Sequence, residues 1–272
     1  MARATLAAEV ARAMLRGAAF NAGYAVITMV WATVSALVGW AMPFPTRFAF
    51  VVGIWARAVL WWLRFTCGIR HCVTGAETLP TEPCVVLAKH QSTWETVYLQ
   101  TQFAPQATVL KRELLRIPFF GWIFTLLRPI AIDRSQKIGA MRQLIRDGAK
   151  RLNEGLWVVL LPEGKRVDPG ENLPFFRGGA ALAHAAKRPI VVVAHNAGRH
   201  WPAHRLAKFP GTIQVRISPP ISTQGRSVTE VNRLAEAWLA EAMEAIATDI
   251  AQMSRLDTYN ALLSMKARRG ST

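Results

Sequence analysis

Residues 84–95 read CVVLAKHQSTWE, an unbroken apolar run followed at once by a cluster of polar and charged side chains. The apolar run, Cys84 to Ala88, is too short for a stable helix and rich in valine, which is typical of a strand. A strand that is apolar at every position has both faces covered, as strands in parallel sheets do. The run therefore predicts a central strand, and the polar cluster from Lys89 to Glu95 lies where that strand ends.

Further short apolar runs follow along the chain, and helical periodicity separates them. Apolar residues recur every three or four positions across 138–152, with Gly155 placed as a helix stop. Residues 227–230, SVTE, have the pattern of a capping box that opens a last helix. Strands alternating with helices indicate an α/β domain with a mostly parallel or mixed sheet flanked by helices. The predicted strands are 84–88, 108–110, 129–132, 157–161, 189–194 and 212–217.

The amino-terminal fifth of the chain is apolar. Residues 17–46 contain no Asp, Glu, Lys or Arg, and about 20 such residues in a helix suffice to cross a bilayer. The stretch is longer than the roughly 7 to 15 apolar residues of a cleaved signal, so we expect it to be retained. A second apolar segment, 48–63, contains Arg57 and several tryptophans, a pattern that favours a helix in the headgroup region. Two buried core helices are the alternative.

These segments predict a membrane-attached helix pair at the amino terminus. Pro43 and Pro45 mark the expected turn between its helices. We divide the chain into anchoring helices at 1–74 and an α/β domain at 75–272, which ends in a helix and a basic tail. Arginines flank the first apolar stretch nearly equally on both sides, so charge does not settle whether that helix spans or re-enters the bilayer.

The composition favours a protein that works at a membrane. Hydrophobic residues make up 51% of the chain, ten residues are Trp, and the formal net charge is +16. A basic surface attracts anionic lipid headgroups and nucleic acid alike, so charge alone leaves both partners open. The three cysteines are odd in number and form no C-x-x-C pair, which predicts neither a disulfide framework nor a metal site. A reducing, cytoplasmic environment follows as the expectation.

Within the polar cluster, His90 and Glu95 are five positions apart. On a regular helix such residues point about 140° apart, so they meet only if His90 lies in the turn and the helix begins at Ser92 or Thr93. Glu95 would then accept the proton of one imidazole nitrogen and leave the other free to take a proton from an alcohol. A structural alternative is that residues 92–95, STWE, form a capping box that uses Glu95 on backbone N–H groups.

A second polar cluster follows the strand at 157–161. Residues 161–166, LPEGKR, combine an acid, a glycine and two cations. Gly164 permits a tight turn, and Arg166 can hold a phosphate through two parallel N–H bonds. A solvated turn is the alternative. Lys111 and Arg134 add positive charge at other strand ends, although either could equally be a surface cation.

Together these motifs resemble those of the glycerolipid acyltransferases, and most closely the 1-acyl-sn-glycerol-3-phosphate acyltransferases of bacterial membranes. The family's His-x4-Asp motif is similar to His90 and Glu95, and its Phe-Pro-Glu-Gly-Thr-Arg motif to residues 161–166. Its motif of a Gly, an apolar stretch and an Arg looks like residues 121–134, with Lys-x-Glu-Leu before it at 111–114. Its Pro-led strand resembles 189–194. Four motifs in this order are far more specific than any one of them.

The resemblance implies that His90 and Glu95 perform the catalysis. It also implies an acyl-CoA or acyl-carrier-protein donor, a lysophospholipid acceptor, no cofactor, no metal, and a place on the cytoplasmic side of a bacterial inner membrane among membrane lipids. The residues that it assigns to substrate binding are Lys111, Arg134, Glu163, Gly164 and Arg166.

Three positions depart from the family's pattern. Glu95 stands where Asp is commoner, which adds a methylene and asks for a different imidazole position. Lys165 replaces the usual Thr, which removes a hydroxyl and strengthens the positive field. Leu161 in place of Phe is a conservative change. The Pro-led strand also continues unusually into His195, which could contact substrate, but for which we expect a structural role or a role in supporting the residues that do.

Other functions remain open at this point. The nearest is the same chemistry on another acceptor, such as glycerol 3-phosphate, another lysophospholipid or a lyso-aminolipid. A hydrolase of acyl esters or thioesters is less favoured, because the chain contains no G-x-S-x-G nucleophile elbow. A non-enzymatic basic protein is the third, but no helix-turn-helix, zinc or RNA-binding pattern supports nucleic acid as a partner.

Overall fold

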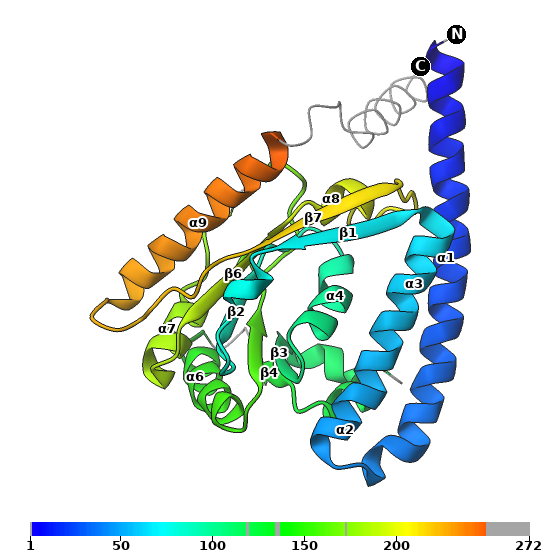
Figure 1. The fold of residues 1–272 in the computed structure, drawn as a ribbon. Helices are drawn as coiled ribbons and strands as arrows, with labels where there is room; N and C mark the ends of the chain where they lie inside the picture. Colours follow the sequence, from blue (N-terminus) through cyan, green and yellow to red (C-terminus); the bar gives the residue numbers. More distant parts are fainter. Residues whose placement is uncertain (1, 118–119, 134–136, 172, 249–272) are drawn as a thin grey trace.

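The computed structural model describes residues 2–117, 120–133, 137–171 and 173–248 and arranges them around one mixed sheet (Figure 1). Within these residues the sheet has seven strands in the order β1-β7-β6-β2-β5-β3-β4. β6 and β7 pair antiparallel, and all other neighbours pair parallel. The predicted α/β fold is therefore confirmed. The strands are β1 (Ile69–Thr74), β2 (Val85–Ala88), β3 (Gln106–Lys111), β4 (Ile130–Ile132), β5 (Trp157–Leu160), β6 (Ile190–His195) and β7 (Gly211–Ile217).

The predicted strands are all present close to their expected bounds, whereas β1 has no counterpart among them. β1 is an edge strand that pairs with β7 through its backbone, and of its side chains only Ile69 is buried. Its sequence therefore lacks the apolar pattern that marks the central strands. β1 also lies inside the range 1–74 that we assigned to the anchor, so that range includes a strand of the sheet. Otherwise the division of the chain into 1–74 and 75–272 stays a prediction.

Alternate residues of the central strands face helices on opposite sides of the sheet. In β2, Val85 and Leu87 belong to one hydrophobic core, while Val86 and Ala88 belong to the other. This double covering is the physical reason why the run is apolar at every position. Over the first face lie α6 (Lys137–Asn153), α7 (Gly178–Ala186) and α9 (Val228–Thr248), and over the second lie α3 (Trp55–Cys67) and α4 (Trp94–Gln102).

Two predicted helix boundaries are confirmed. Gly155 follows the end of α6 with φ of 79°, a left-handed conformation that glycine adopts without strain. Ser227 precedes α9, and its Oγ accepts a hydrogen bond from the backbone N–H of Glu230 at 3.2 Å, one half of the expected capping box. Shorter helices complete the body: η3 (Ala76–Thr78), η4 (Arg112–Arg116), α5 (Phe120–Leu126) and α8 (Ala197–His200).

The amino-terminal helices form a hairpin beside the sheet (Figure 1). Pro43 caps α2 and Pro45 lies in its first turn, which confirms the predicted turn. The apolar stretches Leu6–Ala41 and Phe44–Cys67 are each long and apolar enough to cross a membrane. The hairpin consists of α1 (Ala2–Val38), the 3-10 turn η1 (Gly39–Ala41), α2 (Phe44–Phe48), the π-helical turn η2 (Ala49–Ile54) and α3.

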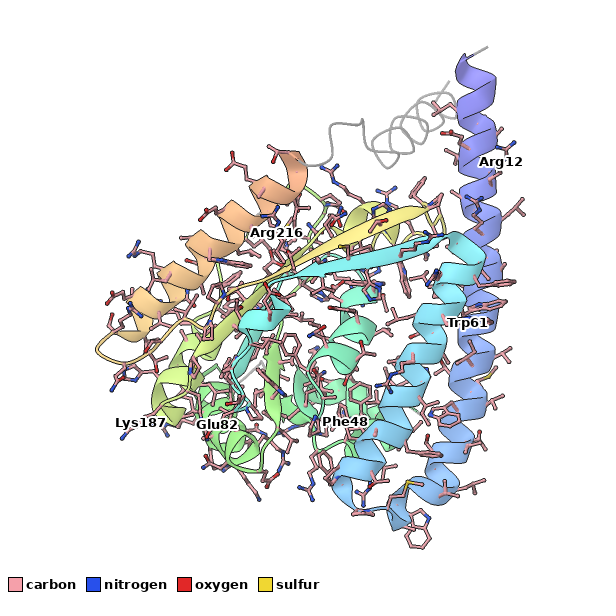
Figure 2. All side chains as sticks on the ribbon, viewed as in Figure 1. Arg12, Phe48, Trp61, Glu82, Lys187 and Arg216 are labelled. Carbon is pink, nitrogen blue, oxygen red and sulfur yellow. The ribbon has the colours of Figure 1, made fainter. Side chains whose placement is uncertain are left out.

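Tryptophan side chains tie the two arms of the hairpin together. The indole N–H of Trp62 donates to the Phe20 carbonyl at 3.1 Å, and that of Trp55 donates to Thr28 Oγ1 at 3.1 Å. The outer face of α3 is different, because Trp61 there is 63% exposed (Figure 2). The hairpin thus leaves large apolar side chains uncovered, unlike the pair of buried core helices that we considered as an alternative.

Candidate active site

The turn after β2 carries the predicted histidine. β2 ends at Ala88, and α4 begins at Trp94 with Thr93 as its N-cap residue. The helix begins slightly later than we expected. The arrangement itself is confirmed, with His90 in the turn and Glu95 in the first turn of α4.

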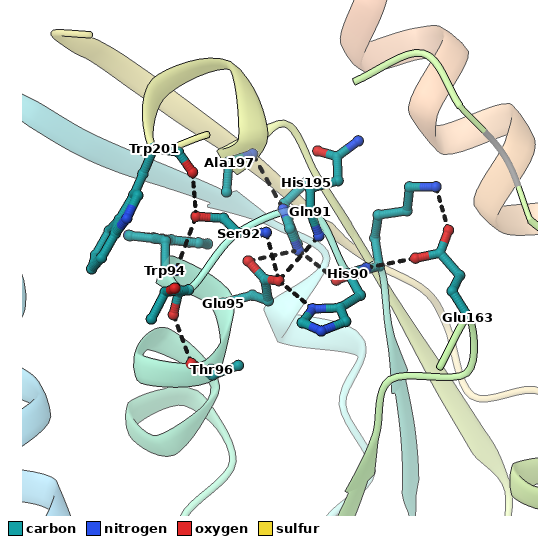
Figure 3. A network of polar contacts seen from close by, with 12 residues as sticks. His90, Gln91, Ser92, Trp94, Glu95, Thr96, Glu163, His195, Ala197 and Trp201 are labelled. Atoms are coloured by element: carbon teal, nitrogen blue, oxygen red, sulfur yellow. Dashed lines mark hydrogen bonds and ion pairs between the residues drawn. The ribbon is translucent and has the colours of Figure 1, made fainter. Parts of the chain in front are cut away.

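His90 and Glu95 meet through a short hydrogen bond. The distance between His90 Nδ1 and Glu95 Oε1 is 2.8 Å (Figure 3). The Glu95 side chain is fully buried, whereas 13% of the His90 side chain is exposed. Because the carboxylate accepts, Nδ1 holds a proton, and in the neutral imidazole Nε2 is then the nitrogen that carries the free lone pair. Nε2 makes no hydrogen bond within the described residues, so it is free to act as a base.

The alternative role that we considered for Glu95, accepting backbone N–H groups at the start of the helix, is present together with its bond to His90. Glu95 Oε1 also accepts from the backbone N–H groups of Gln91 at 3.1 Å and Ser92 at 2.9 Å. Ser92 Oγ accepts from the N–H of Trp94 at 3.1 Å rather than from that of Glu95, so the glutamate half of the predicted capping box is the half that the described residues form. One carboxylate oxygen therefore fixes both the start of α4 and the orientation of the imidazole.

Glu163 stands behind this pair rather than facing a substrate. Its carboxylate is fully buried and forms an ion pair with Lys89. Its second oxygen accepts the backbone N–H of His90 at 2.8 Å. We predicted that Glu163 binds substrate, but the structure gives it no exposed oxygen for that contact. Its role in the geometry is to hold the backbone of His90 in place.

An apolar cavity of about 460 Å³ opens beside His90. Gly164 lies in its wall, in a tight turn with φ of 72°. Among the described residues, His90 is the only acidic or basic side chain in the lining. The cavity therefore suits a hydrocarbon chain that ends at His90. Its aliphatic wall includes Val109, Ile132, Ala140, Met141, Leu144 and Leu160.

A polar cavity of about 520 Å³ is lined by Arg166. Arg166 is half-buried, and its buried Nε has no hydrogen-bond partner in the described part of the chain. The next residue, Val167, donates its backbone N–H to the His90 carbonyl at 2.9 Å. The residue that follows Arg166 in the chain is therefore hydrogen-bonded to the backbone of His90, which keeps Arg166 near His90. The rest of the polar lining is Asp168, Glu171, His204 and Arg205.

Comparison with known proteins assigns the chain to a family. An acyltransferase family model matches residues 70–196. A 1-acyl-sn-glycerol-3-phosphate acyltransferase of Pseudomonas aeruginosa is 49% identical over 220 residues, which cover 80% of this chain and 86% of the relative. The chain belongs to this acyltransferase family. A yeast 1-acyl-sn-glycerol-3-phosphate acyltransferase is 33% identical and covers 67% of this chain and 62% of its own length.

A solved acyltransferase shares the fold. The crystal structure of the 1-acyl-sn-glycerophosphate acyltransferase from Thermotoga maritima matches with a TM-score of 0.73 and covers 89% of this chain and 98% of its own. At 22% identity this match speaks for the architecture alone.

The family resemblance also assigns Lys111 and Arg134 to substrate binding. Lys111 ends β3, and its exposed ammonium lies 3.6 Å from the Glu113 carboxylate. Arg134 falls outside the described residues. For both, substrate binding stays a prediction. Within the described residues, no group of three or more His, Cys, Asp or Glu side chains is placed to hold a metal ion.

Two buried residues of the acyltransferase site, Lys89 and His195, make contacts that we did not predict from the sequence. Lys89 neutralises Glu163, and its ammonium also donates to the Glu171 carbonyl at 2.9 Å. His195, at the end of β6, lies 3.9 Å from the Glu95 carboxylate. The signal for Lys89 was available, because a lysine directly after a doubly buried strand needs a partner to be tolerated there.

Proposed function

We propose that this protein transfers a fatty acyl group from a thioester to the free hydroxyl of 1-acylglycerol 3-phosphate and so forms phosphatidic acid. One observation carries the proposal: His90, with its Nδ1 bound to Glu95, lies beside an apolar cavity, and its backbone carbonyl accepts the N–H of Val167, the residue that follows Arg166. The printed name of the Pseudomonas relative supports this acceptor.

The proposed chemistry is a direct transfer with His90 as general base. Nε2 takes the proton of the acceptor hydroxyl while the hydroxyl oxygen attacks the thioester carbonyl. The C–S bond breaks as the tetrahedral intermediate collapses, and the protonated imidazole returns its proton to the leaving thiolate. Glu95 holds Nδ1–H and stabilises the imidazolium between these steps. The substrate hydroxyl is the nucleophile, so the step as proposed needs neither a metal nor a cofactor.

The apolar cavity is the proposed place for an acyl chain. An acyl chain bound against this aliphatic lining would displace water from the neighbourhood of His90, which would strengthen the interaction between His90 and Glu95. A chain bound there would place its thioester carbonyl at the imidazole. Binding energy gained along the chain then serves to position the reacting groups.

The polar cavity is the proposed place for the acceptor's phosphate. The unpaired Nε–H of Arg166 is a charged donor whose hydrogen bond is unmade within the described residues. A buried donor left without a partner is costly, and a phosphate oxygen would satisfy it. Asp168 and Glu171 in the same lining oppose an anion, so the attraction has to come from the cations there, Arg166 and Arg205.

We further propose that the hairpin of α1 and α3 attaches the enzyme to the bacterial inner membrane, with the catalytic domain on the cytoplasmic side. The two long apolar stretches and the exposed Trp61 and Phe65 support attachment. The net charge of +16 supports attraction to anionic lipid. Both substrates are amphiphiles or carry an acyl chain, so a site at the membrane surface meets them where they gather.

A product assay tests the proposal. Detergent-purified protein is supplied with acyl-CoA or acyl-carrier protein and, in turn, with 1-acylglycerol 3-phosphate, glycerol 3-phosphate and other lysophospholipids. Mass spectrometry then identifies the acylated products. We expect phosphatidic acid as the main product, with either donor. His90→Ala should lose at least about 10²-fold in kcat, because loss of a general base costs roughly 10² to 10⁴-fold.

The exposed histidine of α7, His184, provides the matched control. His184→Ala should keep the activity of the unaltered protein. The proposal is wrong if no acceptor is acylated, if another acceptor is strongly preferred, or if His90→Ala remains as active as His184→Ala.

A further inference from the structure

His195 is a buried histidine that touches the catalytic pair from behind. It ends β6, and its side chain is 1% exposed. Its ring lies edge-on to the Trp94 indole, with the ring centroids 5.8 Å apart. Because both faces of the ring are enclosed, His195 has no access to a substrate. Any part that it plays in the reaction must act through its neighbours.

Hydrogen bonds fix which nitrogen of His195 carries the proton. The backbone N–H of Ala197 points at Nδ1 at 3.2 Å, so Nδ1 must accept. Nε2 lies 2.8 Å from the Lys89 carbonyl oxygen, so Nε2 must donate. A second proton on Nδ1 would face the Ala197 N–H directly. Burial also lowers the pKa of His195 below its usual 6.5, and this outweighs the nearby Glu95 carboxylate. The ring is therefore neutral.

The bond from His195 completes the support of one peptide unit. The Lys89 carbonyl and the His90 N–H belong to the same peptide plane. The carbonyl oxygen accepts from His195 Nε2, and the N–H donates to Glu163 Oε2 at 2.8 Å. Side chains from two different segments of the chain thus hold both polar atoms of the peptide that carries the catalytic base. Rotation of that plane would swing the imidazole away from Glu95.

His195 is also close to the unused oxygen of Glu95. Glu95 Oε2 is buried and has no hydrogen-bond partner in the described residues, and His195 Nε2 lies 3.9 Å from it. A protonated His195 would attract this carboxylate and compete with His90 for it. The neutral ring avoids that competition, and Glu95 keeps its bond to His90 through Oε1.

We propose that His195 is a positioning residue for the His90–Glu95 pair: as a neutral Nε2–H imidazole, it holds the Lys89–His90 peptide and leaves the Glu95 carboxylate to His90. The inference rests on the proposed function of the site. It gives a defined part to His195, for which the sequence predicted a structural or supporting role without naming the groups that it holds.

Two conservative replacements separate the two hydrogen bonds of His195. The amide nitrogen of glutamine lies as many bonds from Cβ as Nε2 does, so His195→Gln keeps a donor for the Lys89 carbonyl. The amide of asparagine lies as many bonds from Cβ as Nδ1 does, so His195→Asn keeps an acceptor for the Ala197 N–H but loses the donor. Steady-state kcat and KM for both substrates are measured, with thermal unfolding as a check on folding.

We expect His195→Asn to lower kcat by about 10- to 100-fold, because a misplacement of roughly 1 Å at a reacting group costs about that much. KM for donor and acceptor should stay nearly unchanged, since neither cavity includes His195 among its lining residues. His195→Gln should recover most of the lost kcat. If His195→Asn has the same kcat as the unaltered protein, the proposal is overturned. It is also overturned if both variants lose the same share of kcat and that loss matches the loss of folded protein in each.

The same measurements distinguish the positioning role from the proposed function. If the unaltered protein transfers no acyl group to any acceptor, the proposed function fails. If it is active and the two variants behave alike, the proposed function stands and only the positioning role is lost.

Discussion

Glu95 Oε1 binds His90 Nδ1 at 2.8 Å while it also accepts the N–H groups of Gln91 and Ser92. The same atom therefore determines where α4 begins and how the imidazole is oriented. The glutamate side chain is long enough to extend from the first turn of α4 back to the His90 imidazole and to the backbone N–H groups that precede the helix. On the same backbone, the carboxylate of an aspartate would lie one methylene farther from these partners.

This double role predicts different losses for two substitutions. Glu95→Gln keeps an acceptor oxygen but loses the charge that stabilises the imidazolium, so we expect kcat to fall by about 10² to 10⁴-fold, as in triads that lose their acid. Glu95→Asp keeps the charge but shortens the reach, and we expect a smaller loss of about 10-fold. Steady-state kinetics at saturating substrate measure both.

Glu241→Gln, an exposed change on α9, is the control for loss of a carboxylate in general. Thermal unfolding should show a lower Tm for Glu95→Asp, because its bonds to the helix start are weakened. Full activity of Glu95→Gln would remove the carboxylate from the mechanism.

The sequence predicted the central strands well because burial on both faces leaves a continuous apolar run. Val85 to Ala88 is the clearest case, since its alternate side chains enter two different cores. β1 could not be predicted in this way. It is held in the sheet by backbone bonds to β7, while most of its side chains face solvent.

The contact between His90 and Glu95 was also predictable, because both residues lie within one short stretch whose local geometry can be worked out. Glu163 was not, and its motif suggested a substrate contact. Its actual partner, Lys89, is distant in sequence and meets it only because β2 and β5 are neighbours in the sheet. His195 reaches the site in the same way, since β6 is the other neighbour of β2. Contacts that depend on strand order cannot be read from local spacing.

The unpaired Nε of Arg166 predicts a specific kinetic effect. Arg166→Ala should raise KM for 1-acylglycerol 3-phosphate by about 10- to 100-fold, because charge-assisted hydrogen bonds are worth roughly 1.5–3 kcal/mol. KM for the acyl donor should change little. Arg166→Lys should recover part of the loss, since it restores the charge without the two parallel N–H bonds.

Lys165→Ala is the matched control, because Lys165 is the exposed neighbour in the same turn and lines neither cavity. Initial rates across acceptor and donor concentrations separate the two KM values. An acceptor KM that is the same in Arg166→Ala and Lys165→Ala contradicts a phosphate contact.

The apolar cavity predicts that chain-length preference can be changed from α6. Ala140 is half-buried and lies in the cavity wall, so Ala140→Leu would occupy space that a long acyl chain needs. One methylene in an apolar pocket is worth about 1–3 kcal/mol. We therefore expect kcat/KM for long-chain thioesters to fall by about 10-fold or more, with short-chain thioesters much less affected.

Competition between thioesters of different length, read by mass spectrometry of the products, measures this preference directly. Ala185→Leu adds the same side chain at an exposed position of α7 and should leave the preference unchanged. If Ala140→Leu slows all chain lengths equally, the acyl chain lies elsewhere.

The buried ammonium of Lys208 predicts a dependence of stability on pH. It donates to the carbonyls of Arg205 and Leu206 at 3.0 and 3.1 Å and lies 5.4 Å from the centre of the Trp201 ring. Burial lowers the pKa of Lys208 from 10.5 to about 8. Between these values the unfolded chain binds a proton that the folded protein does not, so the free energy of unfolding should decrease as pH falls from 10.5 to 8.

Thermal unfolding between pH 7 and 10 measures this effect as a difference between the unaltered protein and Lys208→Met. The stability of the unaltered protein relative to Lys208→Met should rise toward alkaline pH, where the unaltered protein regains stability that the variant never lost, and should level off below the folded pKa of about 8. Lys187→Met removes an exposed lysine and should run parallel to the unaltered protein. A constant difference across the whole range would mean that Lys208 keeps an ordinary pKa.

The outer face of α3 predicts where the protein meets lipid. Trp61 and Phe65 stack with ring centroids 5.6 Å apart and are 63% and 71% exposed. Glutamate at both positions would place charge where apolar contact is expected and would repel anionic headgroups. Full burial of one large apolar side chain is worth about 1.5–3 kcal/mol, so the double variant should bind vesicles containing anionic lipid at least about 10-fold more weakly.

Ile138→Glu changes an equally exposed apolar residue on α6, away from the hairpin, and should bind like the unaltered protein in the same sedimentation assay. Equal binding by all three proteins would show that this face of α3 does not enter the membrane.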